Sequence, residues 1–226
     1  LHEGSLTMTL ASFWEVYAQD RKPRVRESTW ATKEHIVRDK ILPFFGDMPV
    51  CEITSADVIS WQNELSSHRD PSGAPYSPTY LRTVETQLSA ILNHAVRYYG
   101  LTRNPVLAAG HIGRKNSEMQ FWSKDEYLRF SEAVMDKPDA WLAFEVLYWT
   151  GLREGEMLAL TPSDIDLARN RVSVTKTYQR LHREDVVGPP KTERSRRVVD
   201  IPRFLAEELR DYVAQEGIGR KDRIFR

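Results

Sequence analysis

The sequence predicts a mainly α-helical protein with a small antiparallel β-sheet. Over the first hundred residues, apolar side chains recur three and four positions apart, which is the period of an α-helix. Residues 171–176 and 197–201 instead alternate apolar and polar side chains, as half-buried strands do. A short, polar and basic segment at 111–120 separates these two patterns and indicates an interdomain linker. We therefore expect one domain over residues 7–110 and a second over residues 121–226.

Four helices are expected in the first domain. The residues that can cap their N-termini are Thr9, Ser28 or Thr29, Thr54 with Asp57 in a capping box, and Ser77. Pro43 should end the second helix, because proline lacks the N–H that a helix interior needs. The fourth helix has the clearest pattern: Pro78 occupies its first position, an apolar stripe runs from Leu81 to Tyr99, and Gly100 stands where a C-terminal cap belongs. Residues 103–106 should form the turn that closes this bundle.

The second domain begins with a full capping box, Ser123 with Glu126. Residues 141–149 are apolar nearly all round, which predicts a helix in the middle of this domain. A short helix over 154–160 and a longer one over 203–215 follow. The two alternating segments at 171–176 and 197–201 should pair as strands, so that the basic stretch around Lys191 falls on a β-hairpin.

Composition limits the functional classes. The chain of 226 residues has a formal net charge of zero, which gives no support to a uniformly basic nucleic-acid-binding protein. Its single cysteine, Cys51, excludes an internal disulfide and suits a reducing compartment. No apolar run approaches the roughly 20 residues of a membrane-spanning helix, and the first residues lack the pattern of a signal peptide. We expect a cytoplasmic protein with no membrane partner.

The charge is nevertheless unevenly distributed. The segment from Lys176 to Arg203 contains eight basic and four acidic residues, a net charge of +4. Such a run is commonly a solvated face. On a hairpin, however, alternate side chains project to one side, and the cations would then form a cluster.

Arg153 lies at the mouth of the tight turn Thr-Gly-Leu-Arg-Glu-Gly-Glu, residues 150–156. Its guanidinium fork matches two oxygens of a phosphate, but an ion pair with Glu156 is an equally simple role. Lys191 is either a solvated hairpin lysine or a proton donor, since neighbouring cations disfavour an ammonium ion. The six histidines show no metal-ligand spacing, and no glycine-rich phosphate loop is present. The sequence thus predicts neither a metal nor a nucleotide cofactor.

Taken together, the features closely resemble the tyrosine recombinases, and above all the integrases of bacteriophages and conjugative elements. The order that carries the resemblance is a helical domain, a basic linker, an apolar helix with the turn at 150–156, a strand, and the motif Pro-Lys-Thr-x-x-Ser-x-Arg at 190–197. Residues 103–105 and 160–166 also look like this family. The resemblance covers roughly residues 7–226 and implies a SAM-like core-binding domain followed by part of an α+β catalytic domain.

The resemblance also implies a mechanism for site-specific recombination or integration of a mobile element. In this family a tyrosine attacks a DNA phosphodiester, forms a 3′-phosphotyrosyl bond and frees a 5′-hydroxyl, without a cofactor. Arg153 matches the arginine that grips the phosphate, and Lys191 matches the lysine that protonates the leaving oxygen. Glu156 matches an acidic residue that orients the site. Lys176 is the second choice for the lysine role.

The implied partner is double-stranded DNA, clamped between the two domains, and the full-length protein is expected to form a tetramer on it. Contacts to DNA phosphates are expected from basic side chains in both domains and the linker. These residues are Arg82, Arg97, Arg114, Lys115, Lys176, Arg194, Arg196 and Arg197.

After the lysine hairpin the family pattern continues with a His-x-x-Arg motif, a further His or Trp, and the nucleophilic tyrosine. Residues 198–226 contain neither a histidine nor a tryptophan, so this part of the pattern is not found here. Tyr212 lies outside that sequence context and is not taken as the nucleophile. We therefore expect the parent protein, and not these 226 residues alone, to cleave DNA. Two other hypotheses remain: a truncated, non-catalytic protein that occupies a recombination site, and a helical protein-interaction module, which the zero net charge would suit.

Overall fold

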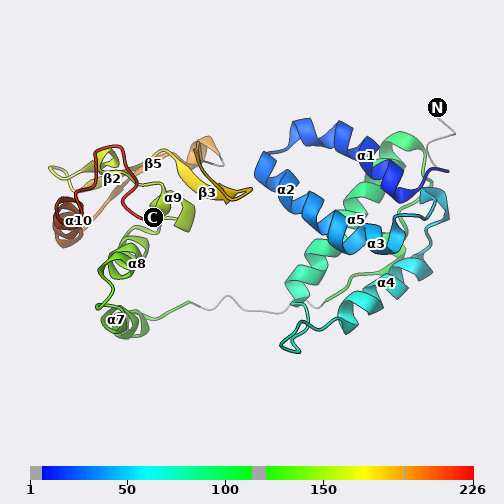
Figure 1. Ribbon diagram of the computed structural model, residues 1–226, viewed down its shortest axis with the longest axis horizontal. Helices are drawn as coiled ribbons and strands as arrows, with labels where there is room; N and C mark the ends of the chain where they lie inside the picture. The colour runs from blue at the N-terminus through cyan, green and yellow to red at the C-terminus, as the bar shows by residue number, and fades with distance from the viewer. Residues whose placement is uncertain (1–6, 114–120, 191) are drawn as a thin grey trace. The chain divides into compact units, whose positions relative to one another are not determined.

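The computed structural model describes residues 7–113, 121–190 and 192–226. The chain divides into two compact units, Leu1–Glu118 (unit 1) and Met119–Arg226 (unit 2). Unit 1 is helical, and unit 2 combines helices with two small antiparallel sheets (Figure 1). The predicted fold class, mainly α with a small antiparallel sheet, is confirmed. Across the described residues, no helix has both the length and the apolar character needed to cross a membrane.

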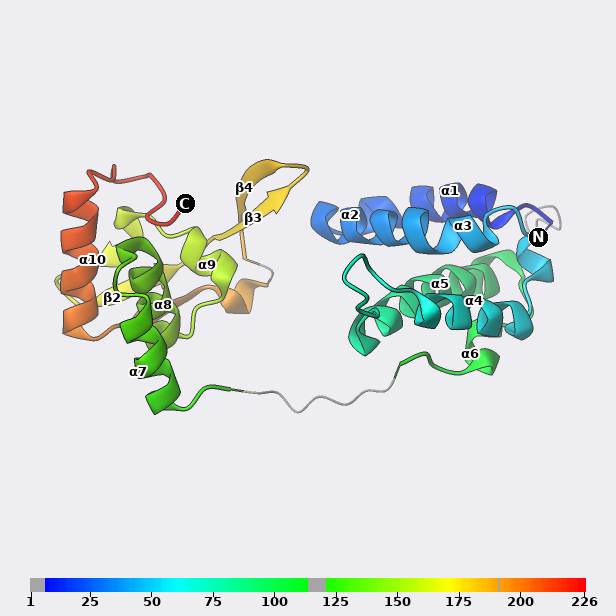
Figure 2. The ribbon, with the colours of Figure 1, turned by 60° about the horizontal axis from the view of Figure 1, so that its bottom comes forward.

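Unit 1 consists of helices in two layers, with α1 to α3 in one layer and α4 and α5 in the other (Figure 2). The long helix α5 packs against α1, α2 and the π-helical turn η3. Phe13, Phe45, Trp61, Leu88 and Ile91 are among the fully buried side chains between the layers. The elements are α1 (Leu10–Arg21), η2 (Lys22–Arg24), α2 (Glu27–Ile36), η3 (Val37–Ile41), α3 (Leu42–Phe45), η4 (Val50–Glu52), α4 (Ser55–Ser67), α5 (Pro78–Tyr99) and α6 (Pro105–Ala109).

Most predicted helix ends of unit 1 are confirmed. The hydroxyls of Thr9, Thr54 and Ser77 each accept a hydrogen bond from a backbone N–H in the first turn of the helix that they cap. Asp57 completes the capping box by accepting from the Thr54 N–H at 2.9 Å. Gly100 ends α5 with a left-handed φ of 81°, a conformation that glycine adopts without steric cost.

The second helix differs from the prediction at both ends. It begins at Glu27, so Ser28 and Thr29 lie inside it and cap nothing; the acidic side chain in the first turn instead suits the positive end of the helix dipole. Pro43 does not end the helical path. The chain passes through η3, where the Leu42 N–H bonds to the Val37 carbonyl five residues back, and then starts α3. Pro43 thus occupies a first turn, where its missing N–H is not required.

The predicted closing turn at 103–106 also differs, because it opens the short helix α6. The side chain of Asn104 accepts a hydrogen bond from the Val106 N–H at 3.0 Å and so caps this helix. Its amide group donates to the Ser89 carbonyl at 3.1 Å. Asn104, in the segment that was expected only to close the bundle, therefore joins α6 to α5.

Unit 2 places α8 and α10 against a three-stranded sheet of order β1-β2-β5. Strands β2 and β5 pair antiparallel, with Val172 opposite Val199, which confirms the two predicted strands. Leu142, Val146, Leu205 and Leu209 belong to the buried core that also includes Val172. The elements are α7 (Lys124–Ala133), α8 (Pro138–Thr150), α9 (Glu154–Leu158), η5 (Pro162–Asp164), β1 (Ile165–Asp166), β2 (Arg171–Val174), β3 (Thr177–Leu181), β4 (Glu184–Gly188), η6 (Glu193–Ser195), β5 (Arg197–Asp200) and α10 (Arg203–Gln215).

The predicted hairpin is interrupted by a second one. Between β2 and β5 the chain forms the separate hairpin β3–β4, with Thr177 opposite Gly188, and the basic stretch after it contains η6. The turn of β3–β4 is made by His182 and Arg183, both with positive φ. Such turns are normally signalled by Asn-Gly or Asp-Gly, and neither pair occurs at this turn, so the hairpin could not be predicted.

The prediction that the helix over 141–149 lies in the middle of its domain is wrong, because α8 is buried on one face only. Leu142, Glu145 and Val146 are buried, but Tyr148 and Trp149 remain partly exposed. The exposed face is aromatic, and Tyr148 stacks on Tyr127 of α7 at 3.6 Å between ring centroids. An apolar helix can thus lie at the margin of the unit, because its outer rings cover one another.

Candidate functional site

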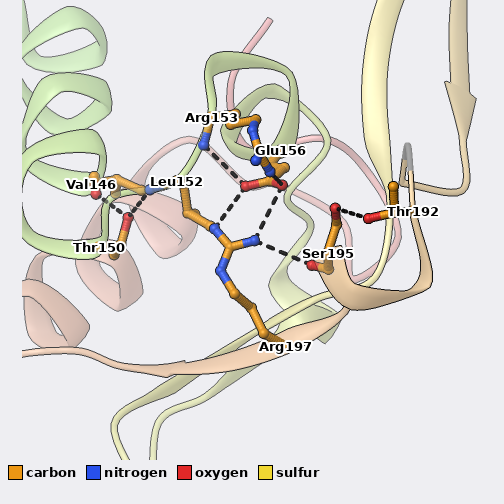
Figure 3. Close-up of polar contacts among 8 residues, drawn as sticks. All are labelled: Val146, Thr150, Leu152, Arg153, Glu156, Thr192, Ser195 and Arg197. Atoms are coloured by element: carbon orange, nitrogen blue, oxygen red, sulfur yellow. Dashed lines mark hydrogen bonds and ion pairs between the residues drawn. The ribbon is translucent and has the colours of Figure 1, made fainter.

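The candidate site is built on the turn between α8 and α9. Gly151 ends α8 with a φ of 61°, and its N–H bonds to the Leu147 carbonyl at 3.0 Å. The Thr150 hydroxyl donates to the Val146 carbonyl and accepts from the Leu152 N–H at 3.2 Å (Figure 3). These bonds reverse the chain within three residues, so that Arg153 becomes the N-cap of α9.

A buried carboxylate holds this turn in place. Glu156 is only 3% exposed and accepts from the Arg153 backbone N–H at 3.0 Å and from Nη1 of the same residue at 3.0 Å. It also accepts from both terminal nitrogens of Arg197, Nη2 at 2.8 Å and Nη1 at 3.2 Å (Figure 3). Glu156 therefore ties the start of α9 to strand β5, which lies 41 residues further along the chain.

The electrostatics show how Glu156 can act. Burial tends to raise its pKa, but the hydrogen bonds from Arg197 and Arg153 prevail and lower the pKa to about 2. The carboxylate is thus ionised near neutral pH and has no proton to exchange there. This arrangement is suited to orienting two guanidinium groups and not to acid–base chemistry.

The ion pair expected as one of the two roles of Arg153 is present, and the geometry is compatible with the other role, phosphate binding. One of its nitrogens pairs with Glu156, yet the side chain is 74% exposed. Arg197 contrasts with it, because its side chain is 32% exposed and its fork is directed at the carboxylate and the Ser195 carbonyl. The ion pair therefore leaves most N–H groups of Arg153 available to a ligand.

Arg153 opens onto a cavity with a basic and hydroxyl-rich lining. Among the described residues, the lining consists of Gly151, Arg153, Thr192, Arg194, Ser195 and Arg197. The hydroxyls of Thr192 and Ser195 lie 3.0 Å apart. Guanidinium and hydroxyl groups facing one cavity can bind a tetrahedral anion such as a phosphate.

The other predicted site residues lie elsewhere or are not described. Lys191, Arg114 and Lys115 lie outside the described residues. Lys176 is not part of the cavity lining, since its Nζ lies 2.7 Å from the Asp164 carboxylate. Arg196 faces Glu193 at 3.7 Å, and Arg82 and Arg97 lie on α5 of unit 1.

Sequence reasoning missed the close approach of α9 to β3. A β-carbon at Gly155 would lie 2.6 Å from the Tyr178 carbonyl oxygen and 2.7 Å from the Thr177 hydroxyl. The glycine in the Arg-Glu-Gly-Glu motif therefore allows the helix that begins at Arg153 to pack directly on the β3 backbone. A glycine inside a short helix is the only hint of this contact in the sequence.

Gly155→Ala is expected to destabilise unit 2 by about 1–3 kcal/mol, because the added methyl group would lie 2.6 Å from the Tyr178 carbonyl oxygen and the backbone would have to shift. Urea unfolding followed by circular dichroism measures the change. Gly188→Ala is the matched control, since a β-carbon there has no neighbour within 4 Å. Equal stability of the two variants would contradict the close packing.

Glu156→Gln is expected to lower the free energy of unfolding by about 3 kcal/mol at pH 7, because a buried ion pair loses one partner. Since the folded-state pKa of Glu156 is depressed to about 2, its contribution is present above the ordinary pKa near 4.5 and is lost as the pH falls toward 2. Urea unfolding at pH 7 and at pH 3 should show that the difference in free energy of unfolding between the natural protein and Glu156→Gln is smaller at pH 3. Glu207, whose side chain is 45% exposed and pairs with Arg203, provides the control Glu207→Gln, for which little change is expected.

Comparison with known proteins gives consistent matches. Residues 9–66 match the family model described as phage integrase, N-terminal SAM-like domain. The chain is 29% identical over 194 residues to the ICEBs1 integrase of Bacillus subtilis (strain 168), covering 84% of this chain and 49% of that protein. It is 29% identical over 179 residues to the integrase of Mycobacterium phage D29, covering 78% and 45%. The chain thus spans about half the length of these relatives.

Solved structures share the fold. The Tn1549 transposon integrase, in complex with transposon right end DNA, matches with a TM-score of 0.78 at 16% identity, over 97% of this chain and 71% of that chain. The lambda integrase tetramer bound to a Holliday junction matches with a TM-score of 0.68 at 19% identity, over 98% and 63%. The resemblance predicted from the sequence is confirmed: the chain is similar in sequence to integrases and shares the fold of tyrosine recombinases. Its similarity lies with the phage-type integrases of that class.

Proposed function

We propose that this chain forms the DNA-binding and phosphate-gripping part of a tyrosine-type site-specific recombinase of a mobile element. In the full-length protein, a tyrosine oxygen would bond to a DNA phosphorus as the bond from phosphorus to the 5′-oxygen breaks. The products would be a 3′-phosphotyrosyl link and a 5′-hydroxyl, and reversal of the step would rejoin the strands. The confirmed resemblance to integrases supports this proposal.

The observation that carries the proposal is the placement of Arg153. Its backbone is fixed by Glu156 while its side chain stays 74% exposed at the edge of a cavity. A guanidinium held in this way can bind two non-bridging oxygens of a phosphate and stabilise the charge that develops in the transition state. Arg194, in the same lining, would add a second cation to the phosphate.

Lys191 would supply the proton that the leaving 5′-oxygen needs. Its chain neighbour Thr192 lines the Arg153 cavity, which supports the assignment of the proton-donor role to Lys191. In the sequence Lys191 is followed closely by Arg194, Arg196 and Arg197, and cations near a lysine would disfavour its ammonium form and ease release of the proton. The proton would pass from Lys191 to the 5′-oxygen as that oxygen leaves phosphorus.

Arg197 would serve this site as a positioning residue. We predicted a DNA contact for it, but its two terminal nitrogens donate to Glu156, which in turn holds Arg153. A planar fork suits the two carboxylate oxygens better than a lysine ammonium would. We propose that Arg197 fixes the direction of Arg153 through Glu156.

Double-stranded DNA is the proposed partner, with units 1 and 2 both contacting it. The tetramer of lambda integrase on a Holliday junction supports a proposal that the full-length protein also assembles into a tetramer on DNA. Backbone phosphates should dominate the contacts, so affinity should fall steeply with salt.

Incubation of the full-length protein with a nicked cognate duplex tests this function. The nick lets the cleaved fragment diffuse away, so a covalent adduct that survives denaturing electrophoresis should accumulate. Retention of DNA in a gel shift without an adduct would favour a non-catalytic occupant of the site. No salt-dependent DNA binding at all would favour a protein-interaction module and overturn the proposal.

A further inference from the structure

Two cations of unit 1, Arg21 and Lys33, converge, and neither forms an ion pair with a carboxylate among residues 7–113. Lys33 on α2 places its Nζ 5.2 Å from the centroid of the Tyr17 ring. Arg21, the last residue of α1, lies one helical turn after Tyr17. Burial raises the pKa of the Tyr17 hydroxyl, and Arg21 opposes the rise. Arg21 and Lys33 are therefore neighbours across the junction of α1 and α2.

The polar groups around this pair leave the positive charge uncompensated. The Lys33 ammonium donates to the neutral amide oxygen of Gln87 on α5 at 2.5 Å. Asp20, next to Arg21 in sequence, instead accepts from His94 at 2.8 Å and from the Tyr99 hydroxyl at 2.7 Å. Among the residues that the structure describes, neither Arg21 nor Lys33 forms an ion pair with a carboxylate.

This arrangement carries an energetic cost. Burial and, after it, the charge of Arg21 lower the pKa of Lys33 to about 8. Like charges that share a partly buried position repel one another. The described contacts of Lys33, with the Tyr17 ring and the Gln87 amide, supply no full negative charge to offset the repulsion. An anion bound between the two side chains would recover this free energy.

The surroundings extend the positive surface beyond one anion. Residues 21–26, Arg-Lys-Pro-Arg-Val-Arg, contain four cations and no carboxylate, in a chain whose formal net charge is zero. Lys22 and Arg24 belong to the short turn η2 and are exposed. A surface with several adjacent cations fits a polyanion with regularly spaced phosphates better than a single small anion.

We propose that Arg21 and Lys33, with Gln87 holding the lysine, form a second phosphate-binding site of this chain, which takes the DNA backbone. The proposal rests on the DNA-binding function proposed above. Lys33 has three N–H donors and uses one on Gln87, so two remain for phosphate oxygens. The Arg21 fork can bind the same phosphate. Contacts of this kind fix where unit 1 sits along the duplex and carry no base sequence information.

The test is duplex-DNA affinity of the full chain, measured by fluorescence anisotropy between 50 and 200 mM salt. Lys33→Met keeps the side-chain length and removes the charge. It is expected to weaken DNA binding about tenfold, as for one charged hydrogen-bonded contact, and to reduce the salt slope by about 1. Arg21→Gln should behave similarly, and the double variant should lose less than the sum, because both cations hold one phosphate.

The stability of Lys33→Met distinguishes a DNA-binding role of Lys33 from a structural role. If Lys33 serves DNA, Lys33→Met should unfold at a higher urea concentration than the natural protein, because an uncompensated cation has been removed. If Lys33 instead stabilises the fold, Lys33→Met should unfold at a lower urea concentration than the natural protein. Arg38→Gln is the control: Arg38 lies on the same helical path but already pairs with Asp39 at 2.8 Å, so its loss should leave the salt slope nearly unchanged.

The outcomes distinguish this site from the proposed function. If the natural chain binds duplex DNA with a clear salt dependence while Lys33→Met and Arg21→Gln bind with the same affinity and slope, this site is wrong and the function stands. Inorganic phosphate, and not DNA, could raise the unfolding midpoint of the natural chain while leaving that of Lys33→Met unchanged. In that case the site binds small anions and the DNA assignment is overturned. If the natural chain binds no DNA, both proposals fail.

Discussion

Arg153→Ala in the full-length recombinase is expected to slow formation of the covalent DNA adduct by about 10²–10³-fold or more, the effect of removing one preorganised donor to a developing oxyanion. DNA affinity should change by only a few-fold, since one phosphate contact among many is lost. The reason lies in the geometry: Glu156 fixes the backbone of Arg153, and the exposed fork faces the cavity. Arg153→Lys keeps the charge without the fork and should recover only part of the rate.

Arg169 offers a closely matched control. Like Arg153 it is an exposed arginine, 73% exposed, and it pairs with a carboxylate three residues away at 3.1 Å. It lies outside the cavity lining. Arg169→Ala should therefore form the adduct at the natural rate. A similar loss in both variants would show that the Arg153 effect arises from surface charge and not from a grip on the reacting phosphate.

Lys191→Ala is expected to slow cleavage strongly, within the range of about 10²–10⁴-fold that positioned acid catalysis contributes. The defect should be specific to the leaving group. With a 5′-bridging phosphorothiolate, the leaving sulfur needs no proton, and the rate of Lys191→Ala should approach that of the natural protein. Single-turnover cleavage of the oxygen and sulfur substrates measures this directly.

The corresponding comparison for Arg153 gives the prediction its specificity. Because Arg153 acts on the non-bridging oxygens, the sulfur substrate should not rescue Arg153→Ala. Rescue of both variants, or of neither, would remove the assignment of Lys191 as proton donor. Lys176→Ala tests the second choice for the lysine, and its pairing with Asp164 at 2.7 Å leads us to expect no rescue by sulfur there.

Local signals in the sequence were sufficient for most helices and for the pairing of the two predicted strands. Ser77 before Pro78 marks a helix start by chemistry that involves neighbouring residues only. Alternation over residues 171–174 and 197–200 likewise identifies strands that each bury one face, and β2 and β5 are indeed paired. Such features are predictable because the residues that cause them are close in the chain.

Long-range contacts were not predictable in the same way. Arg197 follows strand periodicity, but nothing near it in sequence indicates that its partner is Glu156, 41 residues earlier. The β3–β4 hairpin was missed because His182 and Arg183 adopt positive φ without a glycine. Continuation of the helical path past Pro43 depends on the wide turn η3, which has no simple sequence signature.

In the candidate site, too, local contacts could be predicted from the sequence and long-range contacts could not. Arg153 and Glu156 could be identified from a compact motif, because residues three positions apart lie side by side in a helical turn. Arg21 and Lys33 were not identified, because their significance depends on the tertiary contact with Gln87 and on the absence of a carboxylate partner among the described residues. A sequence displays charges, whereas only the fold shows which charges are compensated.

Adduct formation on a nicked cognate duplex, under conditions where all DNA is bound, tests the central claim most directly. The natural full-length protein should accumulate a denaturant-resistant protein–DNA adduct within one turnover. Arg153→Ala, bound to the same DNA, should give almost none, while Arg169→Ala should match the natural protein. Undiminished adduct in Arg153→Ala would contradict the claim that this arginine grips the reacting phosphate.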